Sequence, residues 1–78
     1  MFKVVYLRNQ QRFIKPFDTK DAAMDFGKMG SDYGELYFEY VLDKNDVIVC
    51  DRAYDLFDSP SMVGKKFVYA DDDTIETE

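Results

Sequence analysis

Alternating apolar and polar positions predict two pairs of strands in this chain. Residues 2–8 and 12–17 are rich in β-branched and aromatic side chains, and the short polar connection between them predicts a β-hairpin. Residues 35–42 show the clearest alternation, with Glu35, Tyr37, Glu39 and Val41 expected on the solvent face. A turn cluster and the apolar run 47–50 follow, which predicts a second hairpin.

A helical spacing of apolar residues separates the two hairpins and predicts a helix from about Thr19 to Met29. Asp18 is expected to cap the first turn, and Gly30 is expected to stop the last one. The apolar stripe that should cover the sheet consists of Ala22, Ala23, Phe26 and Met29.

The C-terminal third predicts a short helix over 51–58 and a last strand over 64–70. Residues 71–78 carry too much charge to join the core, so residues 1–70 are expected to form a single globular domain with a flexible acidic tail. The expected order is β-β-α-β-β-(short α)-β. It predicts an α+β fold in which one main helix packs on one face of an antiparallel or mixed sheet of four to five strands.

Length and composition support one folded domain of modest stability, with 78 residues, 46% hydrophobic and 17% aromatic. The sequence has no apolar run approaching the roughly 18 residues of a membrane span, and the N-terminus lacks the features of a signal peptide. We therefore expect a cytoplasmic protein without membrane association.

The chain lacks the residues of most catalytic and metal sites. It has no histidine and a single cysteine, Cys50, which excludes a Ser-His-Asp relay, a Cys-His nucleophile and a cysteine-rich zinc site. Asp43, Asp46 and Asp51 are the best candidates for a carboxylate pair, but turns keep such groups hydrated. We expect no enzymatic activity, cofactor or metal.

The charges are sorted by position. The first 17 residues carry Lys3, Arg8, Arg12 and Lys15 and no acid, whereas residues 18–78 hold all 16 acids against six bases. Such sorting acts on partners and association more than on the fold.

The acidic block predicts a protein-binding surface. It could occupy a basic, nucleic-acid-binding surface of a partner protein, with Tyr37 as an anchor. A solvated surface that only keeps the protein soluble is the plain alternative. The expected partner-binding residues are Glu35, Tyr37, Glu39, Asp43, Asp46, Asp51, Asp55, Asp58, Asp71, Asp72 and Asp73.

The basic block supports a different hypothesis, a small nucleic-acid-binding or regulatory domain. Its four cations alternate with aromatic residues, the combination that single-strand binders use for phosphate contacts and base stacking. The net charge of −6 argues against it. The two blocks are also complementary, so a homodimer is a further hypothesis.

In size, acidity, aromatic content and lack of catalytic groups, the chain resembles the small acidic proteins that bacteriophages make to disable host machinery, including those that mimic DNA. The resemblance implies a target protein with a basic nucleic-acid-binding surface. It carries over no individual residue.

Overall fold

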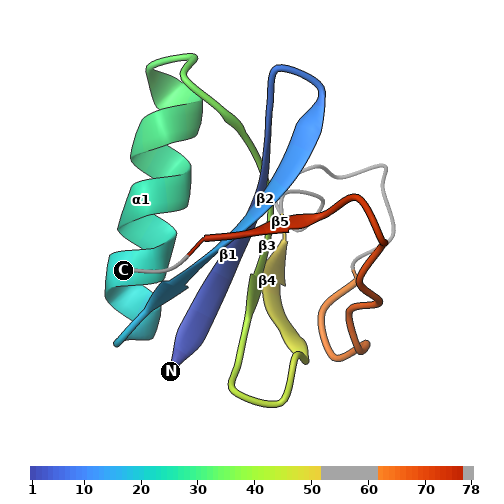
Figure 1. Ribbon diagram of the computed structural model, residues 1–78. Helices are drawn as coiled ribbons and strands as arrows, with labels where there is room; N and C mark the ends of the chain where they lie inside the picture. The colour runs from blue at the N-terminus through green and yellow to red at the C-terminus, as the bar shows by residue number, and fades with distance from the viewer. Residues whose placement is uncertain (52–61, 77–78) are drawn as a thin grey trace.

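The structure is a computed structural model that describes residues 1–51 and 62–76 (Figure 1). The described strands form one sheet in the order β4-β3-β1-β2-β5, in which β2 and β5 are parallel and the other neighbours antiparallel. One helix packs against this mixed sheet, which confirms the α+β fold. The elements are β1 (Phe2–Arg8), β2 (Gln11–Phe17), α1 (Lys20–Asp32), β3 (Tyr37–Leu42), β4 (Ile48–Asp51) and β5 (Thr74–Ile75).

The first hairpin forms as expected, and its turn is tight. Asn9 and Gln10 both have positive φ, 53° and 67°, as a two-residue type I′ turn requires. The turn aligns Arg8 with Gln11 and Lys3 with Pro16 across the pair. The basic block of the sequence is therefore one rigid ribbon.

The helix differs from the expectation at both ends. Thr19, and not Asp18, is the N-cap, and its Oγ1 accepts a hydrogen bond from the Ala22 backbone N–H at 3.1 Å. The helix also continues past Gly30 to Asp32. Gly30 is not a stop signal because it lies in the buried face of α1.

Small residues form that buried face. Ala23, Gly27 and Gly30 are buried, while Ala22 and Met29 of the expected stripe are exposed. A Cβ at Gly27 would lie 2.7 Å from a ring carbon of Phe38, which is too close for an ordinary contact. The helix therefore approaches the sheet closely at Gly27 and Gly30, where no Cβ stands between the helix and the sheet.

A bulge in β3 overturns the simple alternation expected for this strand. Tyr6 of β1 pairs with Phe38 and Val5 pairs with Tyr40, so Glu39 is the extra residue. Beyond the bulge the pattern is shifted, and Val41 is buried instead of solvent-exposed. The strand consequently contributes to the packing on both faces of the sheet.

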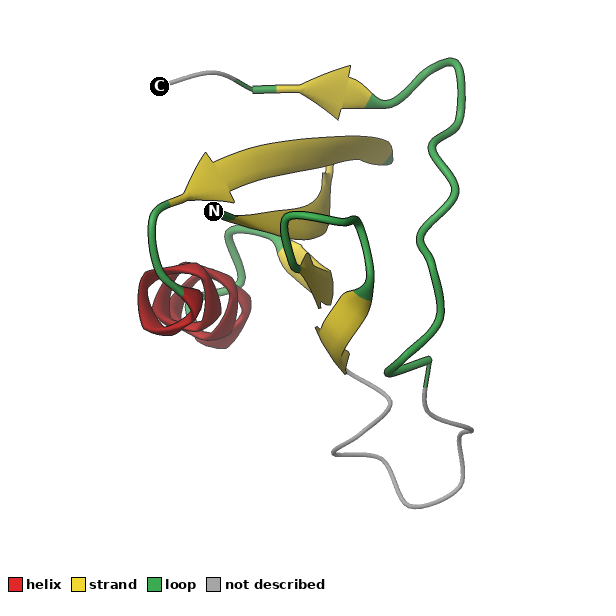
Figure 2. Cartoon of the chain, turned by 90° about the horizontal axis from the view of Figure 1, so that it is seen from below, coloured by secondary structure: helices red, strands yellow, loops and turns green. Residues whose placement is uncertain are grey.

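Both faces of the sheet are covered, by α1 on one side and by the chain from residue 62 onward on the other (Figure 2). The buried cluster that includes Ala23 of the helix also contains Val4, Tyr6, Leu36, Phe38 and Val41. The cluster on the opposite face contains Val5, Ile14, Leu42, Ile48 and Phe67. We call these the helix face and the second face.

The C-terminal third departs most from the expectation. No strand forms over 64–70, where Lys66 makes an isolated bridge to Val47. The last strand is instead Thr74–Ile75, inside the segment expected to be a flexible tail, and it pairs with β2. Of the expected short helix, Asp51 belongs to β4 and the rest lies outside the described residues.

The contact between Gly27 and Phe38 predicts that Gly27→Ala destabilises the protein. Alanine is favoured over glycine in a helix by about 1 kcal/mol. The added Cβ, however, must displace a buried aromatic ring. We expect a net loss of about 1–3 kcal/mol in the free energy of unfolding, measured by denaturant titration. Lys28→Ala, on the exposed side of the same helix, should change it by less than about 0.5 kcal/mol. A Gly27→Ala variant at least as stable as the unmodified protein would contradict the close approach.

Candidate functional site

The cations of the first hairpin bind acids from distant parts of the chain. Lys3 donates a hydrogen bond from Nζ to Asp46 Oδ1 at 2.8 Å and lies 3.4 Å from the Tyr69 hydroxyl. Tyr69 in turn donates to the same Asp46 oxygen at 3.0 Å. One carboxylate thus joins β1, the β3–β4 turn and the segment that covers the second face.

Arg12 likewise binds acids from distant parts of the chain, on the second face of the sheet. Its Nε lies 3.2 Å from Glu39 Oε1, and its Nη1 lies 3.7 Å from Asp73 Oδ2. The guanidinium carbon is 5.4 Å from the ring centroid of Phe67, within range of a cation–π interaction. Asp73 is almost completely buried, with 3% of its side chain exposed, so this ion pair is partly desolvated.

Glu76 engages the helix face of the same hairpin. The Tyr6 hydroxyl donates a hydrogen bond to Glu76 Oε1, and Lys15 Nζ lies 3.9 Å from Oε2. Arg8, at the hairpin end, is exposed, and its guanidinium carbon lies 5.7 Å from the Tyr6 ring centroid. Three of the four hairpin cations are therefore used within the molecule.

These contacts shift several pKa values in consistent directions. The hydrogen bond from Lys3 lowers the pKa of Asp46, and the same bond raises the pKa of Lys3. Burial, followed by the hydrogen bond to Asp46, raises the pKa of Tyr69. Burial and then the bond to Glu76 raise the pKa of Tyr6 to about 12. All four groups keep their ordinary charge at neutral pH and act as structural links.

The expected acidic surface is only partly brought together. Glu39, Asp46 and Asp73 bind cations of the hairpin as described above. Asp51 is buried, 1% exposed, and accepts a hydrogen bond from the Met62 N–H. Asp51 is therefore not part of an outer surface.

The remaining predicted acids lie in several places. Asp43 stabilises its own turn, because its Oδ1 accepts hydrogen bonds from the Asn45 and Val47 N–H groups at 2.8 and 3.0 Å. Asp71 and Asp72 are exposed in a turn. Asp55 and Asp58 lie outside the described residues.

Exposed lysines lie close to Asp43 and Asp46. The β3–β4 turn carries Lys44, and the turn at 62–66 carries Lys65 and Lys66. The Val47–Lys66 bridge joins the two turns. This end of the molecule is therefore mixed in charge, and it is not the acidic surface that the sequence predicted.

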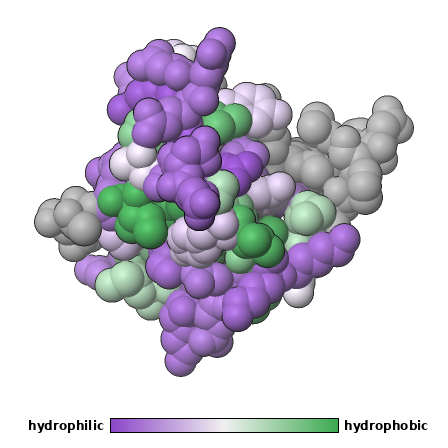
Figure 3. Space-filling model, turned by 45° about the vertical axis from the view of Figure 1, so that its right-hand side comes forward, coloured by the Kyte–Doolittle hydropathy of each residue, from purple (hydrophilic) through white to green (hydrophobic). Residues whose placement is uncertain are grey.

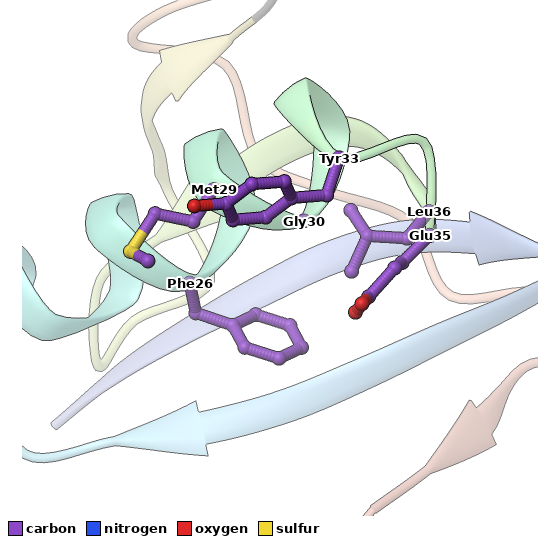
Figure 4. Close-up of a pocket in the computed structure, with 6 residues that line it drawn as sticks. All are labelled: Phe26, Met29, Gly30, Tyr33, Glu35 and Leu36. Atoms are coloured by element: carbon purple, nitrogen blue, oxygen red, sulfur yellow. The ribbon is translucent and has the colours of Figure 1, made fainter.

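Figure 3 shows a side of the molecule on which hydrophilic residues cover most of the described surface and hydrophobic patches are small and separate. A better-defined hollow lies at the C-terminal end of α1, and we call it the helix-end groove (Figure 4). Its volume is about 320 Å³. Its lining consists of Phe26, Met29, Gly30, Tyr33, Glu35 and Leu36.

The groove combines apolar walls with one carboxylate. Tyr33 is 74% exposed and Met29 is 55% exposed, so the two side chains present apolar surface at the rim of the groove. The Phe26 and Tyr33 rings lie on different sides of the hollow, and the Glu35 carboxylate points into it (Figure 4). Tyr37 begins the next strand and is half exposed.

The outer side of α1 carries three acids that were not among the predicted partner-binding residues. Asp21, Asp25 and Asp32 are exposed and follow one another at i, i+4 and i+11, so they lie within about 40° of one another around the helix axis. Lys28 lies in the same stripe. The helical period that located the apolar residues could have located this stripe as well, since both depend on the same angular spacing.

Among residues 1–51 and 62–76, no group of three or more metal-ligating side chains is placed to hold a metal ion. Within the same residues, no helix combines the length and apolar character needed to cross a membrane. Cys50 is partly buried and packs against the cluster on the helix face.

No protein-family model, curated protein or solved structure matches this chain. The site is therefore interpreted from its own geometry. The described residues place an acidic, partly apolar groove at one end of the helix, and they tie most of the basic hairpin into internal ion pairs.

The Lys3–Asp46 pair predicts a specific pH dependence of stability. The pKa of Asp46 is lowered below its ordinary value of 3.8, so the pair stabilises the fold above that pH and loses this contribution as the pH falls below it. Asp46→Asn should cost about 1 kcal/mol at pH 7, as expected for a partly exposed pair. This loss in the free energy of unfolding should become smaller as the pH falls below 3.8.

Asparagine keeps the positive φ of 64° at position 46 accessible, so this variant tests the charge and not the backbone. The measurement is urea unfolding between pH 2.5 and 7, with Asp72→Asn as the exposed control. An Asp46→Asn deficit of the same size at every pH would show that the pair has no electrostatic role.

Proposed function

We propose that this protein is a non-enzymatic binding module that places the outer side of α1 and the helix-end groove against a basic surface of a partner protein. The observation that carries the proposal is the position of Glu35 inside an exposed groove with apolar walls. Interfaces combine a desolvated aromatic or methionine centre with a polar rim, and the groove with its neighbouring acids has this composition.

The acidic stripe supports a partner rich in lysine and arginine. Asp21 and Asp25 are about 6 Å apart along the helix axis, and Asp32 lies about 10 Å further along. Lys28 lies in the same stripe, so the three acids leave the outer side of α1 with a net negative charge, and Glu35 adds a carboxylate at the C-terminal end of the helix. This charge would steer a basic partner toward the site and fix its orientation.

The action that follows is occlusion. A protein whose lysines and arginines normally bind nucleic acid offers a surface complementary to these acids, and occupation of that surface excludes the nucleic acid. The alternative, direct nucleic-acid binding by the first hairpin, is less favoured because Lys3, Arg12 and Lys15 already have acidic partners. A phosphate chain would have to displace these acids before it could bind.

Charge reversal at the groove provides the test. Immobilised protein, the Asp32→Lys/Glu35→Lys variant and the control Asp71→Lys/Asp72→Lys are each incubated with lysate of the source cells. Bound proteins are eluted with salt and identified by mass spectrometry. The two variants change the net charge equally, and both alter exposed acids. We expect a protein with a basic surface to bind the unmodified chain and the control, and to bind the groove variant roughly tenfold more weakly.

Three outcomes would contradict the proposal. Equal retention by all three proteins would exclude the groove as the contact. Equal loss from both variants would show attraction by net charge alone. A retained partner without a basic surface would refute the proposed complementarity.

A further inference from the structure

The outer edge of β2 is occupied by the chain's own acidic segment, residues 71–76, which we call the strap. β5 within the strap runs parallel to β2, with Phe13 opposite Thr74 and Ile14 opposite Ile75. The Glu76 N–H also donates a hydrogen bond to the Ile14 carbonyl at 2.8 Å. The strap thus binds as an added strand, which is a common way for proteins to bind extended peptides.

Two carboxylates, three residues apart, hold the strap from opposite sides of this edge. Asp73 binds Arg12 on the second face. Glu76 binds Tyr6 and Lys15 on the helix face. The edge therefore holds an extended backbone of the same chain through acids at positions i and i+3.

The strap itself is a weak occupant. Its only large apolar side chain, Ile75, is 61% exposed, so burial of apolar surface contributes little to its attachment. The strand pairing covers two residues of β2, although β2 has seven. Pro16 cannot donate a hydrogen bond, but the strand N-terminal to it offers more backbone than the strap uses.

We propose that the edge of β2 is a binding site for an extended acidic segment of a partner protein, and that the strap occupies and masks this site. A longer acidic strand would pair with more of β2 than the strap does and would displace it. A second copy of this chain is a poorer occupant, because its strap would make the contacts that the internal strap already makes. This site binds the opposite charge from the helix-end groove and lies next to it, because Lys15 Nζ is 5.4 Å from the ring centroid of Phe26, which lines the groove.

The test opens the site in the full-length chain and supplies the acidic segment in solution. Asp73→Asn/Glu76→Gln removes both charges from the strap and keeps the side chains nearly isosteric. The probe is a fluorescent, end-capped peptide with the sequence of residues 70–76. Fluorescence anisotropy measures its affinity for the unmodified protein, for this variant and for the control Asp71→Asn/Asp72→Asn, which removes two exposed acids of the same strap.

We expect the opened variant to bind the peptide about tenfold more tightly than the other two proteins, as follows if the strap masks the site about nine-tenths of the time. Circular dichroism checks that the variant is folded, and Glu76→Gln alone replaces it if the double variant is not. A scrambled peptide of the same composition should bind weakly.

The proposal fails if opening the strap leaves the affinity unchanged, or if the scrambled peptide binds equally well. It also fails if a single-stranded oligonucleotide binds the opened variant at low salt while the peptide does not. That last result would instead assign the masked edge to nucleic acid.

Discussion

The burial of β1 on both faces is the constraint on which the rest of the structure depends. β1 is the central strand of the sheet, and its residues alternate between Val4 and Tyr6 on the helix face and Val5 on the second face, all fully buried. The described chain has one helix, which covers one of these faces. The other must be covered by the irregular segment after residue 62, to which Phe67 contributes the main buried side chain. Met62 and Tyr69 of the same segment pack against this cluster as partly buried side chains.

The sorted charges add to this apolar cover. The covering segment is also held by ion pairs and hydrogen bonds to the hairpin it lies on. Lys3 binds Asp46 together with Tyr69, and Arg12 binds Asp73. The basic and acidic blocks of the sequence therefore bind each other within the folded molecule. A chain whose bases lay next to their acids in sequence would form local pairs and would not bring its C-terminal segment onto the sheet.

The sequence predicted the features that depend on local periodicity. Both hairpins, the helix and the α+β class follow from alternation and from helical spacing. The buried helix face was missed, because Gly27 and Gly30 resemble stop signals until the neighbouring Phe38 and Leu36 are known. The bulge at Glu39 was missed as well, since register is set by the partner strand.

In the candidate site, too, the sequence predicted what depends on neighbouring residues and missed what depends on distant ones. The sequence placed Glu35 and Tyr37 on the solvent face of a predicted strand, and the structure places both on the exterior. It could not separate free acids from paired ones, because the partners of Glu39, Asp46 and Asp73 lie 27 to 61 positions away. Periodicity carries no information at that range.

Folding also changes where the exposed positive and negative charges of the chain lie. Along the chain the bases come first and the acids follow, but in the folded protein the exposed acids Asp25 and Asp32 belong to α1, while the exposed lysines Lys44 and Lys65 belong to turns. Three of the four cations of the basic hairpin are paired with acids of the same molecule. The distribution of charge that a partner protein meets therefore differs from the order of charges along the sequence. The exposed stripe of α1 keeps a net negative charge, because Asp21, Asp25 and Asp32 outnumber Lys28 there.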